Sequence, residues 1–137
     1  MFSYFTKSEK ETKDLAKKLA KKISGVISLT GDLGAGKTTF TQGFAKGLGI
    51  KDKIISPTFV LIRQHKIDDK KIFYHIDLYR LENTQALLHL GLKEICADPN
   101  NIILIEWGEK AKNLLPKKQT KIYFEATDKT LRKITVY

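Results

Sequence analysis

The sequence predicts an α/β fold with a mixed central β-sheet, on three observations. Helix-like and strand-like segments alternate over the first half of the chain, which is typical of helices packed on a partly parallel sheet. The last part of the chain holds two strand-like segments joined by a short turn, which indicates antiparallel neighbours. Between the first half and the last part of the chain, residues 102–105 form a continuous apolar run, which is typical of a central strand covered on both faces. We therefore expect three layers, with helices on both faces of one sheet.

The first half of the chain is expected to open with a helix. Ser8 and Glu11 have the spacing of a capping box, apolar residues then recur at helical spacing as far as Ile23, and Gly25 ends the helix. Residues 26–29 form a short, mostly apolar run that we interpret as a buried strand. A glycine-rich turn over residues 31–36 follows, and then a helix over residues 37–48 that Gly49 ends.

The second half of the chain is expected to contain more strands than helices. Residues 59–66 and 71–77 are expected to form a hairpin that turns at residues 68–69. Residues 83–90 are expected to form a short helix capped by Asn83. Strands are then expected over residues 101–106, 120–126 and 131–137, and the last two turn at residues 128–129.

The length and composition limit the class of protein. The chain has 137 residues, without repeats or a linker, so we expect a single domain over residues 1–137. No apolar run approaches the roughly 18 residues of a membrane span, and residues 1–10 carry no apolar run of the kind a secretory signal needs, so we expect neither. A lone cysteine, Cys96, fits a reducing compartment, so we expect a cytoplasmic protein without membrane attachment. The net charge of +10 is compatible with anionic partners, although the scattered lysines favour a solvated surface.

A phosphate-binding motif follows the first predicted strand. Residues 31–38 read Gly-Asp-Leu-Gly-Ala-Gly-Lys-Thr and match G-x-x-x-x-G-K-[ST] in full. Gly31, Gly34 and Gly36 allow backbone N–H groups to approach phosphate, and the next helix directs its positive end at the same point. Lys37 is expected to reach the β- and γ-phosphates, and the Thr38 hydroxyl can ligate Mg²⁺. The motif predicts a P-loop nucleoside triphosphatase.

Such an enzyme needs an acid at the end of a neighbouring strand, and two are available. Glu106 ends the more continuous apolar strand and is expected to serve the metal. Asp77 ends the strand before it and could serve the same site or cap a turn. Thr58, after Ser56-Pro57, could sense the γ-phosphate or belong to an ordinary turn. The three histidines have no metal-site spacing, so structural or surface roles are expected for them.

The sequence also bears on which nucleotide is bound and which reaction is catalysed. The chain lacks the N-K-x-D motif that reads guanine, which favours ATP over GTP. A small-molecule kinase is one alternative, although no arginine-rich lid is evident. A nucleic-acid-binding module that uses ATP as a structural ligand is another, although aromatic residues do not alternate with a basic stripe. Because no arginine finger is evident, ATP hydrolysis by the chain alone is expected to be slow.

Four motifs together resemble one family. They are Gly-Asp-Leu-Gly-Ala-Gly-Lys-Thr-Thr-Phe at 31–40, Ser-Pro-Thr-Phe at 56–59, His-Ile-Asp-Leu-Tyr-Arg-Leu at 75–81 and Ile-Glu-Trp at 105–107. In this order and spacing they resemble the TsaE (YjeE) family of bacterial P-loop ATPases. The resemblance implies a role in forming threonylcarbamoyladenosine beside the tRNA anticodon. It also implies TsaB and TsaD as partners, an ATPase that resets their complex between turnovers, and contact with tRNA only through that complex.

The resemblance also implies roles for individual residues. Residues 34–39, which are Gly34, Ala35, Gly36, Lys37, Thr38 and Thr39, would hold the triphosphate of ATP. Thr38 and Glu106 would hold Mg²⁺, with Asp77 near the metal or the γ-phosphate. Thr58 would act as a switch-like residue, and Trp107 would lie beside the catalytic acid. Thr12 and Arg132 match family positions near the nucleotide.

Overall fold

A central seven-stranded sheet organises the chain. A computed structural model describes residues 1–32, 34–51, 62–83 and 85–137, apart from the side chain of Lys112. The order across the sheet is β1-β7-β6-β2-β5-β4-β3. The strands are β1 (Phe2–Thr6), β2 (Val26–Gly31), β3 (Ile62–Lys66), β4 (Ile72–Asp77), β5 (Asn101–Glu106), β6 (Thr120–Ala126) and β7 (Arg132–Val136). β2 pairs in parallel with both β5 and β6, and β4 pairs in parallel with β5. The other pairs of neighbouring strands are antiparallel. The predicted mixed sheet is confirmed.

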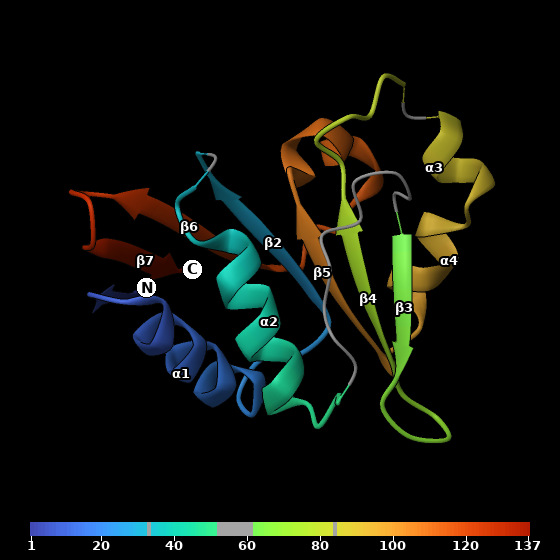
Figure 1. Cartoon of the computed structure of the whole chain (residues 1–137). Coiled ribbons are helices and arrows are strands. Elements are labelled where there is room, and N and C mark those ends of the chain that lie inside the picture. The colour runs from blue at the N-terminus through green and yellow to red at the C-terminus, as the bar shows by residue number, and fades with distance from the viewer. Residues whose placement is uncertain (33, 52–61, 84) are drawn as a thin grey trace.

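Helices cover both faces of this sheet, so the expected three layers are present. On one face lie α1 (Glu9–Ala20) and α2 (Lys37–Gly47), which pack against each other and on a core that includes Phe40, Phe44 and Phe73 (Figure 1). The other face carries α3 (Gln85–His89), α4 (Leu92–Ala97) and the 3-10 helix η1 (Gly108–Leu114). Ile103 and Ile105 belong to that second core, whereas Leu104 belongs to the first. β5 therefore has apolar contacts on both faces, as its continuous apolar run predicts.

Local signals explain where several elements begin. The Ser8 hydroxyl accepts a hydrogen bond from the Glu11 N–H at 3.1 Å, which caps α1 as expected. The Asn83 side chain accepts hydrogen bonds from the first two residues of α3, from the Gln85 N–H at 3.0 Å and from the Ala86 N–H at 3.4 Å. Both predicted caps are confirmed. The strand expected over residues 59–66 is described only from Ile62, because residues 52–61 lie outside the described residues.

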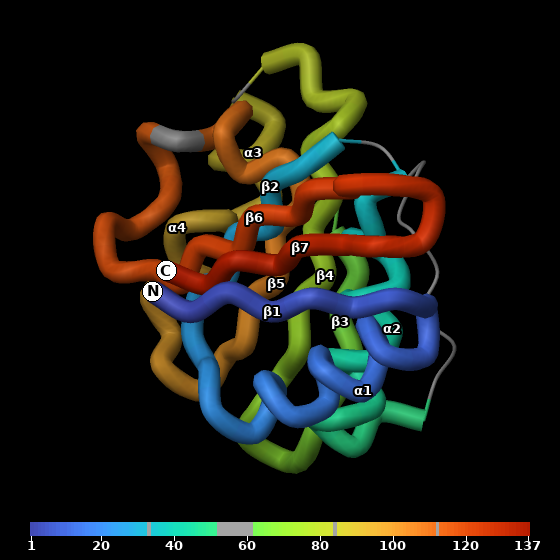
Figure 2. Tube along the Cα trace, turned by 90° about the vertical axis from the view of Figure 1, so that its left-hand side faces the viewer, coloured from blue at the N-terminus to red at the C-terminus, as the bar shows by residue number. Residues whose placement is uncertain are grey.

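Three elements were not expected. The chain opens with β1, an edge strand that pairs with β7 from Phe2 opposite Val136 to Thr6 opposite Arg132. This pairing brings the N-terminus beside the last strand, and the two ends of the chain lie close together (Figure 2). Tyr4 is partly buried and Thr6 is buried while Ser3 and Phe5 are exposed, but so short an alternation does not identify a strand, and β1 depends on its distant partner. The short helices α4 and η1 likewise pack on the second core, and neither has a strong pattern of its own.

Cys96 in α4 provides a test of this second core, against which it packs partly buried. Burial raises the pKa of the Cys96 thiol from its ordinary value of 9.0 to about 11. The reactive thiolate is therefore scarcer in the folded protein, and two pKa units correspond to roughly 100-fold at pH 8. We expect iodoacetamide to alkylate Cys96 about 100-fold more slowly in the native protein than in urea, as measured by mass spectrometry. Equal rates would contradict this packing.

Among the residues that the structure describes, no helix combines the length and the apolarity needed to cross a membrane.

Candidate nucleotide-binding site

The phosphate-binding motif forms the connection between β2 and α2. Gly31 ends β2, and a Cβ atom there would lie 2.6 Å from the Phe124 carbonyl oxygen of β6, so only glycine fits. Gly36 precedes α2 with φ of 104°, in the left-handed region that glycine adopts without strain. The N-terminus of α2, with Lys37, Thr38 and Thr39, therefore starts immediately after the loop. Its unpaired N–H groups and positive dipole end suit a bound phosphate.

Lys37 is held inside this loop by two contacts. Its side-chain Nζ donates a hydrogen bond of 2.6 Å to the Gly31 carbonyl oxygen, and the residue is only 5% exposed. The same Nζ lies 3.8 Å from the centre of the Trp107 ring. Desolvation by burial lowers the pKa of the Lys37 ammonium, and attraction from Glu106, Glu109, Asp77 and Asp32 partly offsets this shift. The ammonium is thus already oriented at the loop.

The two candidate acids lie side by side at the ends of parallel strands. β4 and β5 pair so that Asp77 is opposite Glu106, and the Leu78 N–H donates to the Glu106 carbonyl oxygen at 3.0 Å. Glu106 is buried, with 3% of its surface exposed. The Asp77 carboxylate accepts a hydrogen bond from the Tyr79 N–H at 3.0 Å. Asp77 therefore caps the following turn, and it also lines the cavity described below. Its position is compatible with both roles that the sequence left open, a turn cap and a residue of the site.

His75 contacts an acid of the site, although the sequence did not predict this role. His75 is fully buried, and its Nε2 lies 2.7 Å from Glu106 Oε2. We expected structural or surface roles for the histidines. Contact between a histidine and Glu106, the acid expected to serve the metal, was not among them. Strand alternation provided a signal, because His75, Asp77 and Glu106 occupy positions of one face once β4 and β5 are paired in this register.

The loop, the lysine and the acids surround one cavity of about 380 Å³. Its lining includes Gly34, Gly36, Lys37, Thr38, Thr39, Asp77, Glu106 and Trp107 from the sequence-predicted set, with Glu9, Tyr79 and Arg80 in addition. The oxygens of Thr38, Asp77 and Glu106 are of the hard type that Mg²⁺ prefers. No cluster of three or more His, Cys, Asp or Glu side chains in the described part of the chain can hold a metal alone. The residues therefore fit a Mg²⁺ ion completed by phosphate oxygens and water, as is usual for this ion.

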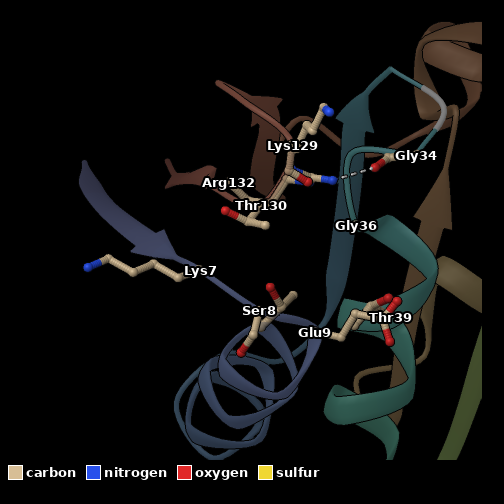
Figure 3. A pocket seen from close by; sticks show the side chains of 10 residues that line it. Lys7, Ser8, Glu9, Gly34, Gly36, Thr39, Lys129, Thr130 and Arg132 are labelled. Atoms are coloured by element: carbon tan, nitrogen blue, oxygen red, sulfur yellow. Dashed lines mark hydrogen bonds between the residues drawn. The ribbon is translucent and has the colours of Figure 1, made fainter.

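A second cavity of about 230 Å³ shares Glu9, Gly34, Gly36 and Thr39 with the first. Thr12 and Arg132 line it, as do Lys7 and Ser8, which precede α1, and Lys129 and Thr130 from the turn between β6 and β7. Figure 3 shows Arg132 reaching the Gly34 carbonyl oxygen, a contact of 3.3 Å, with Lys129 and Thr130 beside it, whereas the Lys7 side chain points away from the loop. Residues that are far apart in the sequence thus meet beside the phosphate-binding loop.

One predicted residue, Ala35, is absent from the lining of both cavities. Ala35 is buried beneath the loop, and its N–H donates to the Asp32 carbonyl oxygen at 3.1 Å. Thr58 lies outside the described residues.

Trp107 adopts an unusual backbone conformation for a bulky residue, with φ of 61°. Its ring packs between the Lys37 ammonium and Tyr79, and the two aromatic ring centres are 5.2 Å apart. Because this is the only tryptophan in the chain, its emission reports on the surroundings of the Trp107 ring, which include the Lys37 ammonium. We expect ADP with Mg²⁺ to produce a saturable change in fluorescence, since Lys37 must turn from the Gly31 carbonyl toward phosphate. Unchanged emission at a nucleotide concentration shown by calorimetry to saturate the protein would contradict this arrangement.

Comparison with known proteins gives a consistent result. The family model described as "Threonylcarbamoyl adenosine biosynthesis protein TsaE" matches residues 6–134. The chain is 44% identical over 128 residues to the tRNA threonylcarbamoyladenosine biosynthesis protein TsaE of Rickettsia conorii, covering 91% of this chain and 71% of that protein. It is 40% identical over 132 residues to the protein of the same name from Bacillus subtilis, covering 95% and 81%.

A solved structure agrees with the fold. The crystal structure of Bacillus subtilis YdiB superposes with a TM-score of 0.76 and 34% sequence identity, covering 98% of this chain and 83% of that one. The match of the family model over most of the chain, with relatives above 40% identity, identifies the family independently of the site geometry. The chain belongs to the TsaE family.

Proposed function

We propose that this protein is a Mg²⁺-dependent ATPase that supports the formation of threonylcarbamoyladenosine in tRNA. One observation carries the proposal: Lys37, Thr38, Asp77 and Glu106 surround a single cavity at the N-terminus of α2. Carboxylates alone would repel a triphosphate, so their position beside a phosphate loop suits a metal-bound nucleotide. The family membership supports the same pathway, because the relatives are named for it.

The chemistry assigned to each residue follows from its position. The loop and the start of α2 bind the phosphates, and Lys37 offsets charge that develops on the transferred phosphoryl group. Thr38 and Glu106 would hold Mg²⁺, which when bound supplies further positive charge to the phosphate oxygens. Asp77 lies beside Glu106 and can orient either the metal shell or the attacking water. Thr12 and Arg132 contact the base and ribose side of the nucleotide in this proposal.

The partners of the chain are proposed from its family. ATP hydrolysis would reset a TsaB–TsaD complex between turnovers, and tRNA would be reached only within that complex. We expect slow intrinsic hydrolysis, which would suit a partner-dependent enzyme, since an arginine finger supplied in trans accelerates related reactions by about 10³- to 10⁵-fold. Turnover of tens of ATP molecules per second by the protein alone would contradict this dependence.

Product analysis tests the proposal against a small-molecule kinase. Radiolabelled γ-phosphate is expected to appear as inorganic phosphate, at a rate that TsaB and TsaD increase. Transfer of the label to a metabolite, with saturation by that metabolite, would favour the kinase. Direct tRNA binding by the protein alone that weakens steeply with salt would favour the nucleic-acid-binding module.

A further inference from the structure

The buried contact between His75 and Glu106 is not explained by packing alone. Alternation along β4 and β5 puts His75 on the face occupied by Phe73 and Leu104, which belong to the apolar core under α2. An apolar side chain would satisfy this position without the cost of burying a polar ring. His75 is nevertheless 0% exposed, and its polar contact is directed at the acid of the nucleotide cavity.

The hydrogen-bonding chemistry gives this contact a direction. A carboxylate can only accept, so the hydrogen of the 2.7 Å contact resides on His75 Nε2 and is donated to Glu106 Oε2. The other ring nitrogen, Nδ1, is buried and has no hydrogen-bond partner in the part of the chain that the structure describes. The polar function of the imidazole in this structure is therefore directed toward Glu106.

Glu106 needs such a partner because it combines burial with a functional position. It is 3% exposed and lines the phosphate cavity, and its backbone is fixed by pairing with Asp77. Backbone pairing fixes the strand but leaves the torsions of a glutamate side chain free. A donor bound to one oxygen selects one orientation of the carboxylate and leaves the other oxygen available to the cavity.

We propose that His75 is a positioning residue that holds Glu106 through Oε2, so that the carboxylate is oriented for a Mg²⁺–nucleotide complex. The proposal rests on the proposed function in one respect, namely that Glu106 serves the bound metal. It predicts that His75 affects the Mg²⁺ dependence of nucleotide binding, whereas a purely structural residue would affect only stability. Loss of comparable outer partners of metal ligands lowers metal affinity by about 10- to 100-fold.

Three variants separate these roles. H75L removes the donor and keeps an apolar side chain, whereas H75Q can place an amide N–H near the position of Nε2. H65L is a matched control, because His65 lies in β3 and does not line either nucleotide cavity. For each variant, calorimetry would measure ADP affinity in EDTA and across a Mg²⁺ titration, and urea unfolding would measure stability.

We expect H75L to raise the Mg²⁺ concentration for half-maximal enhancement of ADP binding by at least about tenfold. Affinity for ADP in EDTA is expected to change less than twofold. H75Q is expected to recover most of the Mg²⁺ dependence, and H65L to match the wild type. A wild-type Mg²⁺ dependence in H75L, with only its unfolding midpoint lowered, would overturn the proposal.

A double-mutant cycle provides a second test that does not require H75L to be fully stable. In an E106A background, which removes the acceptor of the contact, H75Q and H75N are compared, because the asparagine amide is too short to reach Glu106 as Nε2 does. If His75 acts through Glu106, H75N weakens Mg²⁺ dependence in the wild-type background and adds nothing in E106A. Equal effects of H75N in both backgrounds would overturn the proposal. Failure of the wild type to bind ADP in EDTA or Mg²⁺ would instead refute the proposed nucleotide function itself.

Discussion

Replacement of Lys37 by alanine is expected to lower ATP hydrolysis by at least about 100-fold, the usual effect of losing one preorganised group that stabilises the transition state. Lys37 is the cation held within the loop, 2.6 Å from the Gly31 carbonyl and 5% exposed. Removing it leaves the phosphate cavity with the carboxylates of Asp77 and Glu106 and less compensating charge. Single-turnover release of radiolabelled phosphate measures the loss directly, even where the basal rate is low.

The matched control for this variant is Lys46→Ala. Lys46 lies in the same helix, carries the same charge and is exposed in the last turn, away from both cavities. It is expected to retain the wild-type rate and to change stability by less than about 0.5 kcal/mol. Equal activity of Lys37→Ala and Lys46→Ala would show that the lysine of the motif does not serve the phosphates.

Replacement of Glu106 by glutamine is expected to lower Mg²⁺-dependent hydrolysis by roughly 100-fold or more. It is also expected to affect ADP binding in opposite ways in EDTA and in Mg²⁺. Glutamine has almost the same shape and can still accept a hydrogen bond from His75 Nε2 through its amide oxygen. The substitution removes a buried negative charge from the phosphate cavity. ADP should therefore bind equally well or more tightly in EDTA, whereas the enhancement by Mg²⁺ should be reduced.

The acid that ends another strand of the sheet serves as the control for Glu106. Glu125 in β6 is exposed and is not part of either nucleotide cavity, so Glu125→Gln is expected to leave both binding and hydrolysis unchanged. Unaltered Mg²⁺ dependence in Glu106→Gln would remove Glu106 from the metal site and leave Asp77 as the candidate.

The sequence could predict those parts of the fold that depend on local patterns. Apolar runs located β2 and β5, side-chain caps located α1 and α3, and the glycine motif located the loop before α2. β1 could not be found in this way, because its five residues become a strand only through pairing with β7, about 130 residues later. The short helices α4 and η1 depend similarly on the second core rather than on their own periodicity.

For the candidate site too, the sequence could predict the residues that lie in one local motif, but not the contacts that depend on long-range pairing. The P-loop carries its chemistry in consecutive residues, and the ends of β4 and β5 could be recognised from the acids that follow apolar runs. The role of His75 depends on the register of two strands, since only pairing brings its Nε2 to Glu106. Thr12 and Arg132 were identified by family resemblance, and their shared cavity results from the packing of α1 and the β6–β7 turn around the loop.

Multiple-turnover modification of tRNA by TsaB and TsaD tests the central claim most directly. The reaction would be followed with the wild-type protein, without it, and with Lys37→Ala, at TsaB and TsaD concentrations well below that of tRNA. Product is expected to exceed one equivalent of the TsaB–TsaD complex only with the wild-type protein. Equal product in all three reactions would contradict the proposed role, even if the protein binds and hydrolyses ATP.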